Sequence, residues 1–252
     1  HCRQEHAKYE QNQKTQFDYI FESDNHEALV DNVAKLGLSL SVEAPWQQLS
    51  SPGILSDKQI FMFLESPQGI RIEGLSPEQV MKHIRGCTMD LTLSRKFFRP
   101  MKMLLRGKAL DFASAKESDV RKRFREQVAD ADGIFLKAGE FILAGTNEKL
   151  LLTDDIAGFL TGRSSYSRMG VSVTLTQDIV QPGHEDIIAL QIRNNLPFPI
   201  VIYPDTPVAQ IAFCRLVGSS SSPYGRDPKS KYQGSLNDIR SRFYEDEVYA
   251  HV

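Results

Sequence analysis

The part of the sequence from residue 134 to residue 216 most constrains the fold, because short strand-like runs separated by turns follow one another there. These runs include residues 141–144, 149–152, 171–175, 187–192, 200–203 and 209–216. Pro and Gly fall between them at short intervals, which is typical of a β-barrel or β-sandwich rather than of βαβ units. The pattern therefore predicts a mainly β fold with a few short helices.

Helix and strand signals also precede this region. Ser56 is a candidate N-cap for a short helix at 57–65. The run Ser76-Pro77-Glu78-Gln79 combines a Ser cap, Pro at the first helical position and Gln three residues after the cap. Residues 88–93 alternate as in a strand, and the charged segment 116–132 is expected to form a solvated helix or a mobile excursion.

The chain has 252 residues, which is enough for one large domain with an extension. Residues 1–52 are expected to form an N-terminal extension, in which residues 25–36 have the apolar spacing of an amphipathic helix. The main β domain is expected at 53–217. Residues 218–252 read as a polar tail that cannot bury a core of its own. We expect it to order by closing over an anionic ligand or by docking on a neighbour, and the alternative is a disordered terminus.

The composition argues against several classes of protein. A formal net charge of −2 disfavours a nonspecific DNA-binding protein, and no apolar run approaches the roughly 20 residues that span a bilayer. Cys2, Cys87 and Cys214 form neither a CxxC motif nor a disulfide framework, which indicates a reducing cytoplasm. The zinc-binding patterns of base deaminases and of HExxH metalloproteases are absent, so we expect no zinc, and the P-loop and GxGxxG motifs are absent too.

Residues 162–194 hold the groups best suited to an anionic ligand. The run Arg163-Ser164-Ser165 offers a guanidinium group, two hydroxyls and turn amides, all of which can bind phosphate oxygens. A second arginine, Arg168, follows it, and the polar tail adds Tyr224 and Lys231. Because an Arg-Ser-Ser triplet alone is common in surface loops, it is the combination with these groups that indicates a nucleotide triphosphate site.

Several stretches, in this order along the chain, carry a resemblance to a known family. They are Gly53–Asp57, Thr88–Leu93, Ala138–Ala144, Gly162–Gly170, Pro182-Gly183, Asn194, Ala209-Gln210 and Lys231–Gly234. Together they resemble the deoxycytidine triphosphate (dCTP) deaminase family, a branch of the trimeric deoxyuridine triphosphatase (dUTPase) superfamily. The resemblance covers about residues 53–245, and no single motif carries it alone.

The resemblance implies a dUTPase-like β-barrel, a distorted jelly roll, that assembles as a homotrimer with active sites at subunit interfaces. It implies hydrolytic loss of ammonia from C4 of cytosine without a catalytic metal, with Mg²⁺ accompanying the triphosphate. Ligands of the dCTP, dUTP and dTTP type follow from it, with no DNA or membrane partner.

The resemblance also implies roles for particular residues. Arg163, Ser164 and Ser165 fall where the family binds phosphates and the reacting base, and Arg168 falls on an arginine that helps build the catalytic centre. Tyr224 and Lys231 fall on tail residues that close over the triphosphate. Gln177 falls where a backbone carbonyl helps hold the attacking water.

Two departures from the family bear on catalysis. Counted without gaps from Ser164, the family's catalytic glutamate falls on Gln191, and an amide cannot take a proton from water although it can hydrogen-bond a base edge. Gln181 stands where the family has an aspartate that contacts the sugar. The chain departs from the family at two further positions: Asp186 replaces a glycine, and Ser235 replaces a glutamine in the tail.

Three explanations of Gln191 stay open. It could be an engineered replacement that traps ligand in an active deaminase, or the chain could be a natural relative that binds nucleotides without catalysis. A neighbour, Glu185 or Asp186, could also have taken over as base, although we expect Glu185 and Gln191 on different faces of their strand.

Three functions follow from these alternatives. The first is a dCTP deaminase with Gln191 at the general-base position. The second is a nucleotide-binding or regulatory protein without turnover, and the third is a dUTP diphosphatase.

Overall fold

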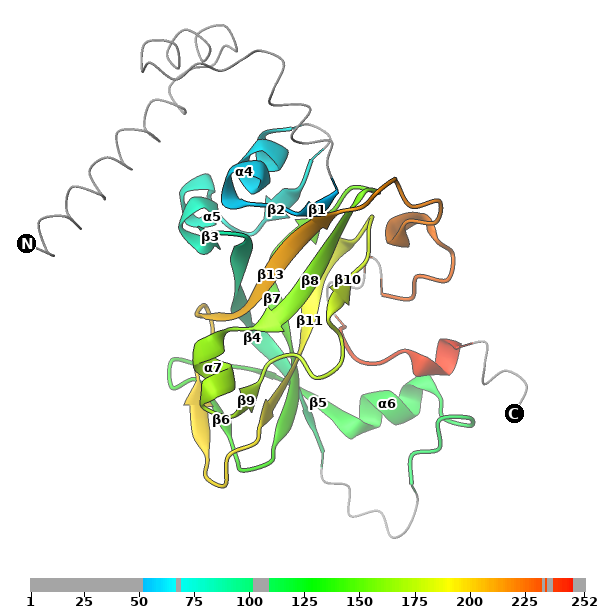
Figure 1. The fold of residues 1–252 in the computed structure, drawn as a ribbon. Helices are drawn as coiled ribbons and strands as arrows, with labels where there is room; N and C mark the ends of the chain where they lie inside the picture. The colour runs from blue at the N-terminus through cyan, green and yellow to red at the C-terminus, as the bar shows by residue number, and fades with distance from the viewer. Residues whose placement is uncertain (1–51, 67–68, 102–108, 233, 235–237, 247–252) are drawn as a thin grey trace, which may run out of the picture. The chain divides into compact units, whose positions relative to one another are not determined.

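The structure is a computed structural model that describes residues 52–66, 69–101, 109–232, 234 and 238–246 (Figure 1). All of these belong to one compact unit that begins at Pro52. The helix predicted at 25–36 lies outside the described residues, as does the rest of the first 51.

Two short helices precede the large sheet, and both begin where their caps predict. Helix α4 (Asp57–Glu65) and helix α5 (Pro77–His83) each start after a serine whose hydroxyl accepts from the backbone N–H three residues later. In each case a glutamine at that third position accepts in return from the serine N–H, so two otherwise unpaired donors are satisfied. No described helix has the length and apolar character needed to cross a membrane.

Seven strands form the path β10-β8-β13-β4-β7-β11-β9 of one curled antiparallel sheet among the described residues (Figure 1). They are β4 (Thr88–Pro100), β7 (Phe141–Leu151), β8 (Ile156–Gly162), β9 (Val171–Ser172), β10 (Ile179–Val180), β11 (Glu185–Asn194) and β13 (Pro207–Arg215). Short strands pair beside this path: β1 (Gly53–Ile54) with β13, β2 (Arg71–Glu73) with β7, and both β3 (Ile84–Arg85) and β5 (Phe124–Val128) with β4. A separate two-stranded sheet joins β6 (Ile134–Leu136) to β12 (Ile200–Ile202). The prediction of a mainly β fold with a few short helices is confirmed.

Several predicted strand boundaries were wrong. The runs 141–144 and 149–152 belong to one strand, β7, and the run 171–175 contributes only the two residues of β9. Strand β8 was missed, although it lies at the centre of one half of the sheet. In the charged segment 116–132, α6 (Glu117–Arg123) is a helix as expected, but the residues after it form β5 and pair with β4.

A buried carboxylate satisfies backbone and side-chain donors where β7 bulges. The register between β7 and β11 shifts between Ile187 and Ala189, which leaves extra β7 residues opposite Ile188. One of them, Glu148, is 0% exposed and accepts from the Thr92 N–H at 2.9 Å and the Thr92 hydroxyl at 2.6 Å. Burial raises the pKa of Glu148, and the bonds from Thr92 oppose that rise.

The substitution Glu148→Gln tests how burial acts on this carboxyl group. Because its pKa is raised above the ordinary 4.5, the folded chain holds the proton more tightly than the unfolded chain. The stability that this group contributes is therefore present below the unfolded pKa and is lost as the pH rises through the folded pKa. Since glutamine does not titrate, the unfolding free energy of the variant relative to wild type should rise as the pH increases above the ordinary glutamate pKa of 4.5. Urea denaturation at several pH values measures this difference, and a constant or falling difference would contradict the prediction.

Candidate functional site

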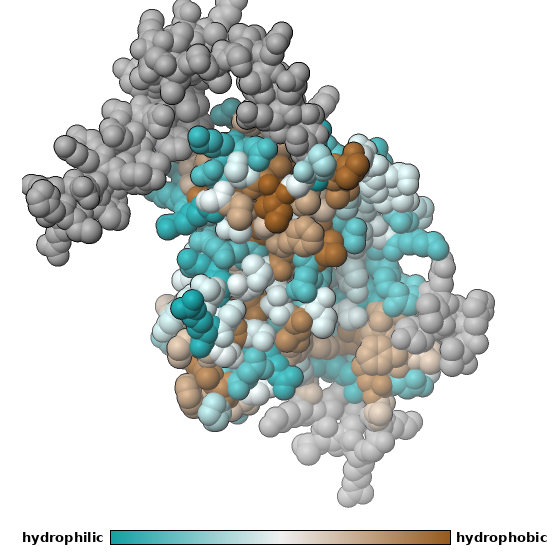
Figure 2. Space-filling view, viewed as in Figure 1, coloured by the Kyte–Doolittle hydropathy of each residue, from teal (hydrophilic) through white to brown (hydrophobic). Residues whose placement is uncertain are grey.

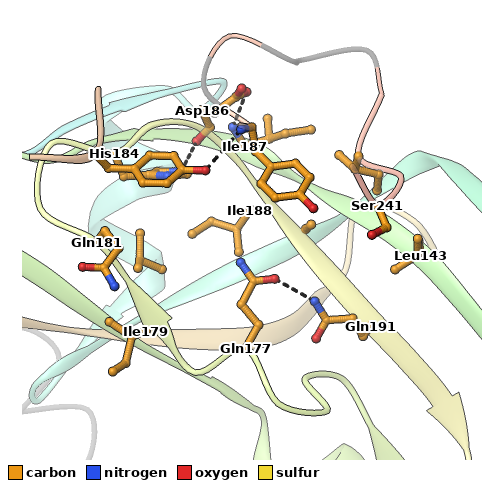
Figure 3. A pocket seen from close by; sticks show the side chains of 15 residues that line it. Leu143, Gln177, Ile179, Gln181, His184, Asp186, Ile187, Ile188, Gln191 and Ser241 are labelled. Carbon is orange, nitrogen blue, oxygen red and sulfur yellow. Dashed lines mark hydrogen bonds between the residues drawn. The ribbon is translucent and has the colours of Figure 1, made fainter. Parts of the chain in front are cut away.

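A cavity of about 370 Å³ lies between β10, β11 and the C-terminal part of the chain (Figure 3). Its wall is largely apolar, with a few polar side chains that converge on the space, as is usual for small-molecule sites. It is lined by Leu143, Gln177, Ile179, Val180, Gln181, His184, Asp186, Ile187, Ile188, Ala189, Gln191, Tyr224, Tyr232, Ile239 and Ser241.

Gln191 reaches the cavity from the middle of β11, where it lies opposite Leu143 of β7. Its Nε2 donates to Oε1 of Gln177 at 2.8 Å, and its Oε1 accepts from the N–H of Leu175 at 3.4 Å. Figure 3 shows the two glutamine side chains joined below Ile188. The general-base position predicted from the sequence therefore holds a hydrogen-bonded amide beside a second amide.

The expected placement of Glu185 relative to Gln191 was wrong. Residues six apart on a strand share a face, and exposure along β11 alternates accordingly, with Glu185 and Gln191 in the same phase. Glu185 nevertheless does not line the cavity, and its carboxylate lies 3.7 Å from Nζ of Lys149. Asp186 does line it, but it is 4% exposed and its Oδ1 accepts from the N–H of Ile187 at 2.8 Å.

His184 was missed as a site residue, although it directly follows the predicted Pro182-Gly183 corner. Its Nε2 lies 3.0 Å from the backbone oxygen of Asp186, and because a carbonyl oxygen only accepts, this nitrogen carries the proton. Burial lowers the pKa of His184, so the imidazole is neutral at neutral pH. Its ring centroid lies 6.2 Å from that of Tyr224.

The tail docks on this corner through its backbone. The N–H of Tyr224 donates to the oxygen of Pro182 at 2.7 Å, and the N–H of Gly225 donates to the oxygen of Gly183 at 3.0 Å. These residues belong to a short 3₁₀ turn, η1 (Tyr224–Arg226). Burial raises the pKa of Tyr224, so its hydroxyl stays protonated at neutral pH.

The end of the described chain folds back and supplies another wall. Ile239 and Ser241 line the cavity, and the N–H of Arg242 donates to the hydroxyl of Tyr232 at 3.1 Å. A second 3₁₀ turn, η2 (Phe243–Glu245), anchors this segment, because the ring of Phe243 packs against that of Phe112 with 4.4 Å between the ring centroids. Nothing in the sequence pattern identifies Ile239 or Ser241, since they reach the cavity only through this reversal.

The predicted phosphate-binding turn lies elsewhere on the same chain. Arg163 caps α7 (Ser164–Arg168), and its Nε lies 3.3 Å from Oδ1 of Asp90. Ser164, Ser165 and Arg168 are exposed. None of these four residues lines the cavity.

The structure thus brings only some of the predicted site residues together. Gln177, Gln181, Gln191 and Tyr224 line the cavity. Lys231 does not, and its Nζ pairs instead with the carboxylate of Asp246. Among the described residues, no group of three or more His, Cys, Asp or Glu side chains could hold a metal ion.

Comparison with known proteins places the chain in a family. The sequence model described as dCTP deaminase-like matches residues 54–216. The dCTP deaminase, dUMP-forming, of Methanosphaera stadtmanae is 33% identical over 195 residues, which cover 77% of this chain and 95% of that protein. The dCTP deaminase of Colwellia psychrerythraea is 28% identical over 201 residues, 77% of this chain and 97% of that protein. The chain belongs to the dCTP deaminase-like family.

One solved structure resembles part of this chain. The 2'-deoxycytidine 5'-triphosphate deaminase from Agrobacterium tumefaciens is 22% identical to this chain, with a TM-score of 0.49. The match covers 65% of this chain and 48% of that one.

Gly183→Ala should loosen the tail without unfolding the sheet. Gly183 has φ +74°, and an alanine Cβ would lie 2.7 Å from Cβ of Pro223. A loss of about 1 kcal/mol of docking energy raises the undocked population roughly fivefold, so trypsin should cleave at Arg226 about fivefold faster. Gly139→Ala is the matched control, because Gly139 has φ +71° and nothing within 4 Å of the added Cβ. If trypsin cleaved both variants equally faster than wild type, the docking of the tail on the Pro182-Gly183 corner would be contradicted.

Proposed function

We propose that the chain binds dCTP in this cavity and deaminates it hydrolytically to dUTP and ammonia. One observation carries the proposal: the loop around β10, strand β11 and the tail each bring predicted site residues to the same cavity. These residues are Gln177, Gln181, Gln191 and Tyr224. The family resemblance implies a role in the site for each of these positions. The curated relatives named as dCTP deaminases support the same substrate.

The reaction needs a group that moves protons. A water molecule adds to C4 of the cytosine, N3 and the departing amine gain protons, and ammonia leaves to give the C4 carbonyl of dUTP. The Gln191 amide can orient the water or the C4 substituent by hydrogen bonding, but it cannot accept the proton of the water. Deamination by the chain as it stands is therefore slow, and its rate is limited by the missing base.

Gln191→Glu should raise the rate of ammonia release from dCTP by about 10²- to 10⁴-fold, the usual contribution of a positioned general base. A coupled ammonia assay measures it, with pyrophosphate followed in parallel because one relative is named as dUMP-forming. Gln181→Glu is the matched control: it places a carboxylate elsewhere in the same cavity and should not raise the rate. No gain in Gln191→Glu would contradict an active deaminase scaffold.

A second function, nucleotide binding without turnover, is favoured by one observation. The Gln191 amide nitrogen donates to Gln177 and its oxygen accepts from the N–H of Leu175, so hydrogen bonds hold the uncharged side chain at both polar atoms. Under this alternative dCTP binds, but neither wild type nor Gln191→Glu releases ammonia.

We further propose that a neighbouring copy of the chain completes the site in a homotrimer. We also propose that the protein works in a reducing cytoplasm. The phosphate-binding turn at Arg163 points to this, because it does not line the cavity of its own chain. An exposed apolar pair supports it: Phe159 and Ile179 are register partners on β8 and β10, 45% and 53% exposed, and Ile179 also lines the cavity. Apolar surface is visible between polar residues on the face shown in Figure 2. Mg²⁺ arrives bound to the triphosphate, as part of the ligand.

Phe159→Asp should break this assembly, because it buries a charge where an apolar contact is expected. Light scattering should show dissociation of the trimer, and calorimetry should show dCTP binding weakened by at least about tenfold, since one half of the site is lost. Phe135→Asp is the matched control, because Phe135 is 49% exposed on the separate sheet of β6 and β12. A trimer that persists in Phe159→Asp with unchanged affinity would contradict the proposed interface.

A further inference from the structure

The positive charges at the edge of the cavity come from the C-terminal part of the chain. Among the described residues, the cavity wall itself contains no lysine or arginine. Lys231 directly precedes the wall residue Tyr232. Arg240 and Arg242 stand on either side of Ser241, which also lines the cavity. These three residues, the rim cations, are the lysines and arginines that directly adjoin a wall residue in the sequence.

Two of the rim cations are paired within their own short segment. Asp238 accepts two bonds from the Arg240 guanidinium, at 2.7 and 2.6 Å, and Glu245 accepts one from Nε of Arg242 at 2.8 Å. The guanidinium carbon of Arg240 also lies 5.0 Å from the ring centroid of Phe98, and the side chain is only 12% exposed. Because each partner is two or three residues away, these pairs shape the local turns of the segment, and Arg240 stays against the sheet.

The third rim cation is paired differently, because its partner comes from a separate stretch of the chain. Nζ of Lys231 pairs with the carboxylate of Asp246, 15 residues further on. The Arg242 guanidinium donates to the backbone oxygen of Lys231, and the Arg242 N–H donates to the Tyr232 hydroxyl at 3.1 Å. The side chains of Lys231 and Asp246 are 22% and 40% exposed, so a dissolved anion can reach this pair.

Asp246 is held beside Lys231 by contacts that do not involve the lysine. The Asp246 N–H donates to the backbone oxygen of Phe243 at 2.9 Å, and the ring of Phe243 packs against that of Phe112. Tethering of this kind gives the carboxylate an effective concentration on the order of millimolar at the ammonium, so an external anion has to compete with it. A polyphosphate can compete, because it brings several negative charges and strong acceptor oxygens where the carboxylate brings one charge.

We propose that Asp246 is an autoinhibitory latch: its carboxylate occupies the Lys231 ammonium in the free protein, and the polyphosphate of a bound nucleotide displaces it. The inference rests on the proposed function, because it needs a phosphorylated ligand in the cavity. The latch lowers the affinity for the phosphates of the ligand and makes no contact with its base. Ile239 and Ser241 line the cavity within the same segment, so release of Asp246 also frees the end of a segment that forms part of the wall.

The test is calorimetric titration of the full-length protein with dCTP, completed before ammonia is detectable. An ionic strength of about 0.15 M is used, because charges that do not touch the ligand are then largely screened beyond about 8 Å. Asp246→Asn should lower the dissociation constant by about twofold to fivefold, the range expected for release of a partly exposed ion pair. In a Lys231→Ala background the same substitution should leave the constant unchanged, since the latch then has no ammonium to occupy.

Asp227→Asn is the matched control. It removes one carboxylate from the same tail, but Oδ1 of Asp227 accepts from the N–H of Lys229 at 2.9 Å, and the dissociation constant should stay as in wild type. The latch would be overturned by an unchanged constant in Asp246→Asn, by equal tightening in Asp227→Asn, or by tightening that persists without Lys231. Each of these results leaves dCTP binding intact. Failure of dCTP to bind wild type and Asp246→Asn alike would overturn the proposed function itself, and the inference with it.

Discussion

Pairing between β11 and β7 is the constraint on which the candidate site depends. Buried backbone groups need partners, and at the bulge the Thr146 hydroxyl donates to the oxygen of Glu148 and accepts from the N–H of Ile188. The irregularity is thus satisfied internally, and β11 keeps strict alternation through it. Because of that alternation, Leu190 and Ile192 enter the core while Gln191, between them, reaches the cavity wall.

Local signals predicted the parts of the fold that depend on local chemistry. The serine caps of α4 and α5 could be read from the sequence because capping involves residues only three apart. Strand β8 was missed because its identity comes from pairing with β13, a partner far away in the sequence. Strand β7 was divided in two for a related reason: the bulge interrupts its apolar pattern, and only pairing to neighbouring strands shows that it continues.

The candidate site was predictable to the extent that its residues lie near recognisable turns. The resemblance to the dCTP deaminase family implied roles for Gln177 and Gln181, and counting from Ser164 placed the family's catalytic glutamate on Gln191. His184 carried a weak signal through the glycine before it. Ile239 and Ser241 carried none, since their position results from a chain reversal held by the contact of Phe243 with Phe112. Motif spacing finds residues that a strand or turn presents, and it misses those that long-range packing delivers.

Backbone groups hold the tail in place, whereas the Tyr224 side chain faces the cavity. Its contacts with Pro182 and Gly183 are made by backbone N–H groups, which every residue except proline possesses. The side chain at position 224 is therefore free to vary while the seat persists. A substitution at position 224 therefore changes the face that the tail offers to the cavity without removing the two backbone bonds that hold it at the corner.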